Sequence, residues 1–190
     1  MSATALTVIH KHLRREMFDF SMRLFRAGPH QVPAIKAAFA ELAALLRTHA
    51  AQEEARLEPA LNDRDTDAAA RLLRDHERLD AELDRLSAAV RALDGSSARC
   101  TDALLQLHLD WNRYLGAYLL HLDDEERDVF AGFAGHMSLE GIAQSALAQG
   151  EEGKRFLDRL WSVTTPTERL AIEDAHADAA YCAENAAAAC

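Results

Sequence analysis

Two short stretches with the same pattern of histidine and glutamate could bind a metal ion. His49 precedes Glu53 by four residues, and the pattern returns later in the chain at His121 and Glu125. On an α-helix, four residues correspond to about one turn and a rise of about 6 Å, so both side chains leave the same face. Each stretch therefore predicts a helix that offers two ligands to one metal site.

Each of these pairs also has a histidine upstream. His10 and His76 both open a His-x-x-Leu sequence, which ends at Leu13 in one case and at Leu79 in the other. The chain thus contains two similar halves, each with a histidine helix followed by a His-x-x-x-Glu helix. Together they supply four imidazoles and two carboxylates. The candidate metal ligands are His10, His49, Glu53, His76, His121 and Glu125.

This donor set contains nitrogen and oxygen atoms but no thiolate, which suits Fe, Mn, Zn or Ni better than Cu(I). Two glutamates on different helices that face a common axis can bridge two metal ions, which leaves about two histidines for each ion. Burying all these groups on apolar helix faces without partners would cost several kcal/mol. The repeated set therefore favours a two-metal site over unrelated polar residues.

The elements that must position these ligands are helices. Hydrophobic residues make up 49% of the 190 residues, and only eight Gly and four Pro interrupt the chain. Apolar residues recur at helical spacing over about 5–26, 33–59, 67–93 and 98–130. We expect an all-α fold, an antiparallel up-down-up-down four-helix bundle with the ligands at similar heights. For the last two segments, the predicted heights of the ligands differ by about two turns, and the loop after Gly95 must absorb some of this difference.

The rest of the chain is expected to form additional short helices. Thr165, Pro166 and Glu168 have the spacing of a capping box with proline in the first turn, so a helix should begin there. The sequence thus predicts a bundle over residues 1–135 and a C-terminal helical extension over 136–190, packed on or beside it.

Charge and composition exclude several classes of protein. The formal net charge is −10 and no basic stripe offsets it, so neither nucleic acid nor a membrane surface is expected as a partner. No apolar run has the length of a transmembrane helix, and the N-terminus lacks the features of a secretory signal. The cysteines have no metal-site or disulfide spacing, which favours free thiols and a cytoplasmic protein. They are Cys100, Cys182 and Cys190.

The remaining histidines are interpreted as non-ligands. His12 lies about 200° around the helix from His10 and should face away from it. The internal match with His76 favours His10 as the ligand of the two. The other four are His30, His108, His136 and His176.

Glutamates next to the candidate ligands and two tyrosines complete the list of polar candidates. The glutamates lie about 100° away from their neighbours and are predicted to face solvent; they are Glu54, Glu77 and Glu126. Tyr114 and Tyr118 lie on the His121 face of their helix, where either phenol could hydrogen-bond a bridging glutamate or a small ligand at the metals. Simple packing is the alternative for both tyrosines.

Over about residues 8–133, this pattern resembles the hemerythrin-like, or HHE cation-binding, family. The resemblance implies a four-helix bundle with an oxo- or hydroxo-bridged di-iron centre, with Mn or Zn as other possible metals. His10, His49, His76 and His121 would be terminal ligands, and Glu53 and Glu125 the bridging carboxylates. Oxygen-carrying members have a further histidine one turn from the ligand at the His76 position, where this chain has Leu72 and Asp80. Asp80 is a possible additional oxygen ligand.

The four-histidine set is more similar to family members tied to iron sensing and to repair of iron–sulfur centres, and the C-terminal helices resemble the extensions of bacterial members. The resemblance implies a protein that binds or senses O₂, NO or iron in stress response or iron homeostasis. A di-iron redox enzyme acting on NO, peroxide or O₂ is an alternative, and so is a zinc-bound or metal-free helical interaction module. A homodimer is possible.

Overall fold

The structure, a computed structural model, describes residues 5–56, 66–129 and 150–169, and every regular element in these ranges is a helix. The predicted all-α class is confirmed. The chain divides into two compact units, which are described separately. The bundle unit is Leu13–Ala131, and the terminal unit combines Met1–His12 with Gly132–Cys190. Within the described residues, no helix is both long enough and apolar enough to cross a membrane.

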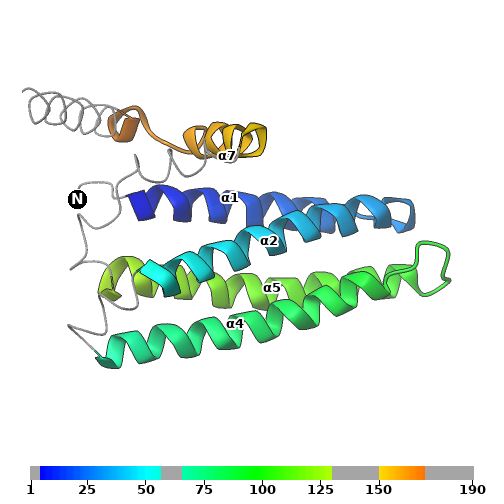
Figure 1. The fold of residues 1–190 in the computed structure, drawn as a ribbon. Helices are drawn as coiled ribbons and strands as arrows, with labels where there is room; N and C mark the ends of the chain where they lie inside the picture. Colours follow the sequence, from blue (N-terminus) through cyan, green and yellow to red (C-terminus); the bar gives the residue numbers. More distant parts are fainter. Residues whose placement is uncertain (1–4, 57–65, 130–149, 170–190) are drawn as a thin grey trace, which may run out of the picture. The chain divides into compact units, whose positions relative to one another are not determined.

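Four long helices lie side by side, and successive helices run in opposite directions (Figure 1). They are α1 (Ala5–Phe25), of which Leu13–Phe25 belongs to the bundle unit, α2 (Val32–Arg56), α4 (Thr66–Ala92) and α5 (Cys100–Asp124). A short 3-10 helix, η1 (Pro29–Gln31), precedes α2. The predicted helix bounds agree to within a few residues. The expected end of the second helix near Pro59 lies outside the described residues.

The apolar stripes predicted from the sequence form the core of the bundle unit. On α4, the buried residues Leu72, His76, Leu79 and Leu83 are three or four residues apart, as on one helix face. Between α1 and α5, the indole N–H of Trp111 donates a 2.7 Å hydrogen bond to Oγ of Ser21. This bond satisfies the polar atom of a fully buried tryptophan and fixes the relative height of the two helices.

The two connections at one end of the bundle unit touch each other. A Cβ atom added to Gly95, between α4 and α5, would lie 2.5 Å from the backbone oxygen of Pro29 in η1. Such a separation is shorter than van der Waals contact, so only glycine fits here without a backbone shift. The connection after α4 is therefore held against the connection that follows α1.

The last helix of the bundle unit widens at its C-terminal end. Instead of continuing regularly to residue 130, α5 ends at Asp124 and is followed by a π-helical segment, η2 (Glu125–Val129). A π turn contains one more residue than an α turn and therefore changes the direction of the side chains within it. Glu125, one of the candidate ligands, is the first residue of this segment.

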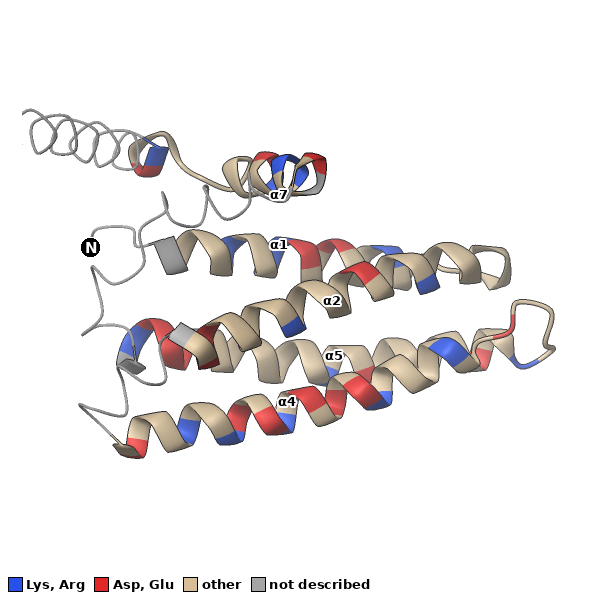
Figure 2. Cartoon of the chain, in the orientation of Figure 1, with Lys and Arg blue, Asp and Glu red and all other residues tan. Residues whose placement is uncertain are grey.

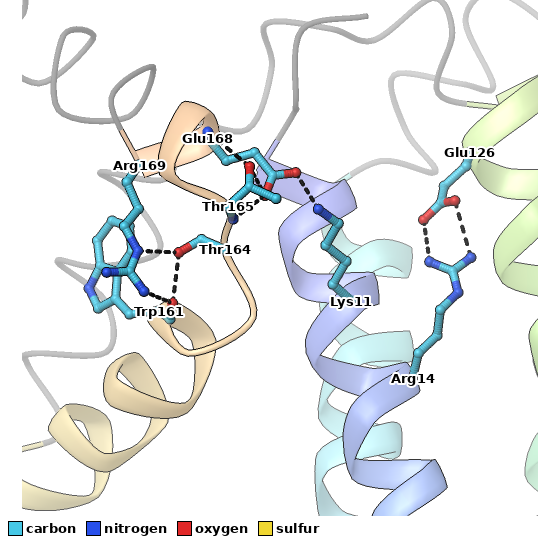
Figure 3. Close-up of polar contacts among 8 residues, drawn as sticks. All are labelled: Lys11, Arg14, Glu126, Trp161, Thr164, Thr165, Glu168 and Arg169. Carbon is cyan, nitrogen blue, oxygen red and sulfur yellow. Dashed lines mark hydrogen bonds and ion pairs between the residues drawn. The ribbon is translucent and has the colours of Figure 1, made fainter.

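In the terminal unit, an ion pair joins the start of α1 to a residue after α7 (Glu151–Trp161). The side chain of Lys11 binds the carboxylate of Glu168 (Figure 3). The backbone N–H of Thr165 donates to Glu168 Oε2 at 2.7 Å, and the N–H of Glu168 donates to Thr165 Oγ1 at 3.2 Å. These reciprocal bonds confirm the predicted capping box, and residues 166–169 are helical.

Candidate metal centre

Five of the six predicted ligands lie in the bundle unit, and all five are buried. His49 and Glu53 come from α2, His76 from α4, His121 from α5 and Glu125 from the start of η2. Their exposed fractions are between 1% and 5%. Ionisable side chains are rarely buried to this extent unless they interact with one another or with a metal ion.

The two His-x-x-x-Glu pairs have the geometry that their spacing predicts. Nε2 of His49 lies 3.3 Å from Oε1 of Glu53, and Nε2 of His121 lies 3.2 Å from Oε1 of Glu125. Each histidine therefore points at the carboxylate one turn further along the chain. The similar separations show that the two repeated motifs adopt the same local arrangement, although Glu125 already lies in η2.

His76 connects the two pairs. Its Nε2 atom lies 3.5 Å from Oε2 of Glu53 and 3.7 Å from Oε1 of Glu125, so the ring stands between carboxylates of two different elements. The rings of His76 and His121 meet edge to face, with centroids 4.9 Å apart. One donor atom from each of these four residues lies within 4.8 Å of every other. The group is compact and compatible with binding a metal ion.

The imidazole atoms that face the carboxylates support this interpretation. In the described part of the chain, Nε2 of His76 and Nε2 of His121 have no hydrogen bond of acceptable geometry, although both atoms are fully buried. A buried polar atom without a hydrogen bond is unfavourable. Both atoms also point at carboxylate oxygens, which are metal donors. The cluster therefore fits a metal ion better than it fits a closed hydrogen-bond network.

The same environment shifts the pKa values of the two histidines in opposite directions. Burial lowers the pKa of His76, but the carboxylates of Glu125 and Glu53 outweigh burial and raise it to about 10. Burial and the charge of His76 together lower the pKa of His121 to about 4. Without metal, the centre thus holds a proton on His76 between two carboxylates. A metal cation at this position would displace that proton.

Glu54 contributes a contact that the sequence did not reveal. Its helical angle predicts a solvent-facing side chain, yet its Oε1 lies 3.2 Å from Nδ1 of His76, and 40% of the side chain remains exposed. A carboxylate that accepts from Nδ1–H orients the ring and leaves Nε2 free to ligate. The sequence signal was the Glu-Glu pair itself, but only the position of α4 beside α2 shows what Glu54 contacts.

Glu126, the corresponding residue of the second motif, also forms a side-chain contact with another helix. Both of its carboxylate oxygens accept from the guanidinium of Arg14 on α1, at 2.7 and 3.1 Å (Figure 3). The bidentate geometry ties η2 to α1. Asp80, the possible extra oxygen ligand, is exposed and belongs to neither group of potential ligands found among the described residues.

The two tyrosines lie on one buried stripe of α5. The ring of Tyr118 meets the edge of His121 with centroids 5.7 Å apart, and Tyr114 packs on Tyr118 at the same centroid distance. Burial raises the pKa of both phenols, and the charges of Glu53 and Glu125 add to the effect at Tyr118. Tyr118 therefore keeps its proton at neutral pH, directly beside a candidate ligand.

The remaining histidines are distributed differently. His10 is buried and stands on the part of α1 that belongs to the terminal unit. His12 is also buried, because its ring packs edge-on against Phe156 of α7, a contact that helix angles could not predict. His30 is exposed, and His108 contacts Phe25 and Asn112. His136 and His176 lie outside the described residues.

Comparison with known proteins agrees with the pattern of ligands. The family model described as the hemerythrin HHE cation binding domain matches residues 1–133. Comparisons with curated proteins and with solved structures gave no match. The matched region is more than half of the chain and contains all six predicted ligands. The chain therefore belongs to the hemerythrin HHE cation-binding domain family.

Proposed function

We propose that this protein binds two iron ions and uses them to bind or sense O₂, NO or iron itself, in stress response or iron homeostasis. The observation that carries the proposal is the buried group formed by Glu53, His76, His121 and Glu125, whose donor atoms converge from the four elements α2, α4, α5 and η2. The donor set of imidazoles and carboxylates without thiolate suits a non-haem iron centre.

The roles assigned to the ligands follow from the two halves of the chain. Glu53 and Glu125 are proposed as bridging carboxylates, because each lies near Nε2 of His76 and also near a histidine of its own motif. His49, His76 and His121 are proposed as terminal ligands. His10 is proposed as the fourth, because it is fully buried and lies on the same face of α1 as the buried Met17.

Bound iron would supply reversible electron transfer and an open position for a diatomic molecule. The protein's own residues would control the surroundings. The buried position excludes water, Glu54 orients the ring of His76, and Tyr118 keeps a proton beside His121. We further propose that residues 1–135 form the di-iron bundle and that residues 136–190 form a helical extension.

Elemental analysis and optical spectra test the proposal. Protein from iron-replete cells, reconstituted anaerobically with Fe(II), should contain about two irons per chain and show charge-transfer bands that change on reduction and reoxidation. His76→Ala and Glu53→Ala should lose most of this iron. His30→Ala, which alters an exposed histidine outside the cluster, should retain it. Well under one iron per chain in the unmodified protein would contradict the proposal.

The position of Tyr118 supports a second candidate, a di-iron redox enzyme, because a protonated phenol beside a ligand can donate a proton or an electron. Peroxide, NO and O₂ should then be turned over faster than by the same amount of free iron, and Tyr118→Phe should lower the rate without lowering iron content. A rate equal to that of free iron would exclude this candidate. A colourless, zinc-loaded or metal-free protein would instead favour a helical interaction module.

A further inference from the structure

The exposed hydrophobic side chains of the bundle unit gather on two neighbouring helices. In the described part of the chain, every exposed large hydrophobic residue lies on α1 or α5 and is between 46% and 70% exposed. We call this surface the α1–α5 face. It consists of Phe18, Met22, Phe25, Leu105, Leu109 and Leu120.

The residues of this face form continuous stripes. Phe18, Met22 and Phe25 are four and three residues apart, so they share one side of α1. On α5, Leu105 and Leu109 are one turn apart, and the ring of His108 between them contacts Phe25 with centroids 5.9 Å apart. The stripes of the two helices therefore meet. Exposed apolar patches that span two elements mark interaction sites more often than scattered hydrophobic residues do.

The α5 helix carries few charged residues compared with α4, as expected of a helix whose outer side is an interaction surface. Figure 2 shows red and blue residues along most of α4, whereas α5 is largely tan. Between Leu104 and Leu122 the only charged residues are Asp110 and Arg113. A bundle helix whose outer side faces water normally carries more charge than this. The outer side of α5 therefore resembles a surface that is covered in the working protein.

We propose that the α1–α5 face binds a second copy of this chain in a twofold symmetric dimer. In such a dimer, with its axis along the seam between the two helices, α1 of each copy lies over α5 of the other at the same height. The contacts Ser21–Trp111 and Phe25–His108 define these heights. They place Asp19 level with Arg113.

Charge complementarity favours a second copy of this chain as the binding partner of the α1–α5 face. In this dimer Asp19 lies level with the partner's Arg113, and the twofold axis forms the same pair a second time with the roles of the two copies exchanged. Within one chain, Asp19 pairs with Arg15 at 3.7 Å and Arg113 pairs with Asp110 at 3.8 Å, and each of these partners lies on the same helix. The same surface thus carries both halves of each ion pair, as an isologous interface must. An anionic membrane lacks this match, and the net charge of −10 opposes it.

Sedimentation velocity on the full-length protein over a range of concentrations tests the proposal. The unmodified chain should be a dimer at about 10 μM, and Leu109→Glu should raise the dissociation constant at least about 100-fold, because each dimer loses two buried leucines and gains two buried charges. Ala88→Glu changes an exposed alanine of α4 in the same way and should leave the dimer intact. Circular dichroism should be unchanged in both variants.

A charge reversal tests the pairing itself. Arg113→Asp should weaken the dimer by about tenfold, because it places two carboxylates opposite each other, and adding Asp19→Arg should restore it. A monomeric unmodified chain at about 100 μM, or a Leu109→Glu variant that dimerises normally, would overturn the proposal. So would binding of the monomer to phosphatidylcholine vesicles that is lost in Leu109→Glu. Failure of the double variant to recover would overturn the twofold pairing.

Discussion

His76 and His121 have opposite pKa shifts although their rings touch and both face the carboxylate of Glu125. Burial lowers the pKa of both rings. The difference arises because His76 lies between two carboxylates that outweigh burial, whereas the positive His76 adds to the effect of burial on His121. The metal-free centre is therefore a buried arrangement of charges in which one imidazolium takes the place of a metal cation.

This arrangement predicts how the stability of the metal-free protein depends on pH. The raised pKa of His76, about 10, gives stability that is fully present below the ordinary value of about 6.5 and is lost as pH rises toward 10. The lowered pKa of His121, about 4, makes the unfolded chain bind more protons between pH 4 and 6.5, so stability falls on acidification through that window. The free energy of unfolding should therefore be greatest near pH 6.5.

Urea unfolding of the chelated protein from pH 5 to pH 9 measures this dependence. Each limb should change by at most about 1.4 kcal/mol per pH unit for one titrating group. His76→Gln should flatten the alkaline limb, and His30→Gln should leave both limbs unchanged. An alkaline limb that persists in His76→Gln would show that another group causes it.

Glu54 is predicted to act on metal affinity through His76. Glu54→Gln keeps the shape of the side chain but removes the negative charge that orients and polarises the ring, so affinity should fall by about 10- to 100-fold. Competition with a coloured chelator measures the change. Glu77→Gln removes an exposed carboxylate next to His76 in the chain and serves as the control. Equal metal affinities for the two variants would show that Glu54 does not act on the metal centre through His76.

At the scale of elements, the two halves of the chain are similar but not equivalent. Glu54 follows the first bridging candidate and binds His76, whereas Glu126 follows the second and binds Arg14. Arg14 stands one turn after His10, where the other half has the acidic Asp80 one turn after His76. The basic residue provides a partner for Glu126 and ties η2 to α1, so the duplication of the motif does not extend to its surroundings.

The contact between the two connections gives a prediction about Gly95. A Cβ at this position meets the backbone oxygen of Pro29, so Gly95→Ala should destabilise the protein by about 1–3 kcal/mol through a forced backbone shift. Gly28→Ala is the matched control, since its Cβ would meet only the side chains of His30 and Gln31, at ordinary contact distances. That change should be neutral or stabilise by up to about 1 kcal/mol. Thermal unfolding of both variants compares them, and equal melting temperatures would contradict the close approach.

For the whole molecule, metal binding should stabilise the fold because the ligands come from helices that are far apart in the chain. A metal present at about 100 times its dissociation constant adds about 2.7 kcal/mol per site to the free energy of unfolding. Chelation should therefore lower the melting temperature, and addition of Fe(II) should restore it. Glu53→Ala should melt at the same temperature with and without chelator. If chelation left the melting temperature of the unmodified protein unchanged, no metal would be bound to the native state.

The amino-acid sequence by itself predicted the helices, the family and the burial of the six candidate ligands. Periodicity determines which face of each helix is apolar, and the faces that carry Leu72 and Leu83 on α4 also carry His76. Local chemistry was sufficient for the capping box at Thr165 and Glu168, since its bonds span only three residues. These features depend on neighbours within a turn or two, which a sequence pattern contains.

Contacts between helices could be known only from the tertiary structure. Helix geometry gives the direction of Glu54 around α2. Which residue it contacts in that direction depends on how α4 packs against α2. The same holds for Glu126 with Arg14, for His12 with Phe156 and for Gly95 with Pro29. The gathering of exposed hydrophobic residues on α1 and α5 also required knowing that these helices are neighbours. Helix periodicity specifies directions around one axis, whereas packing specifies what stands in each direction.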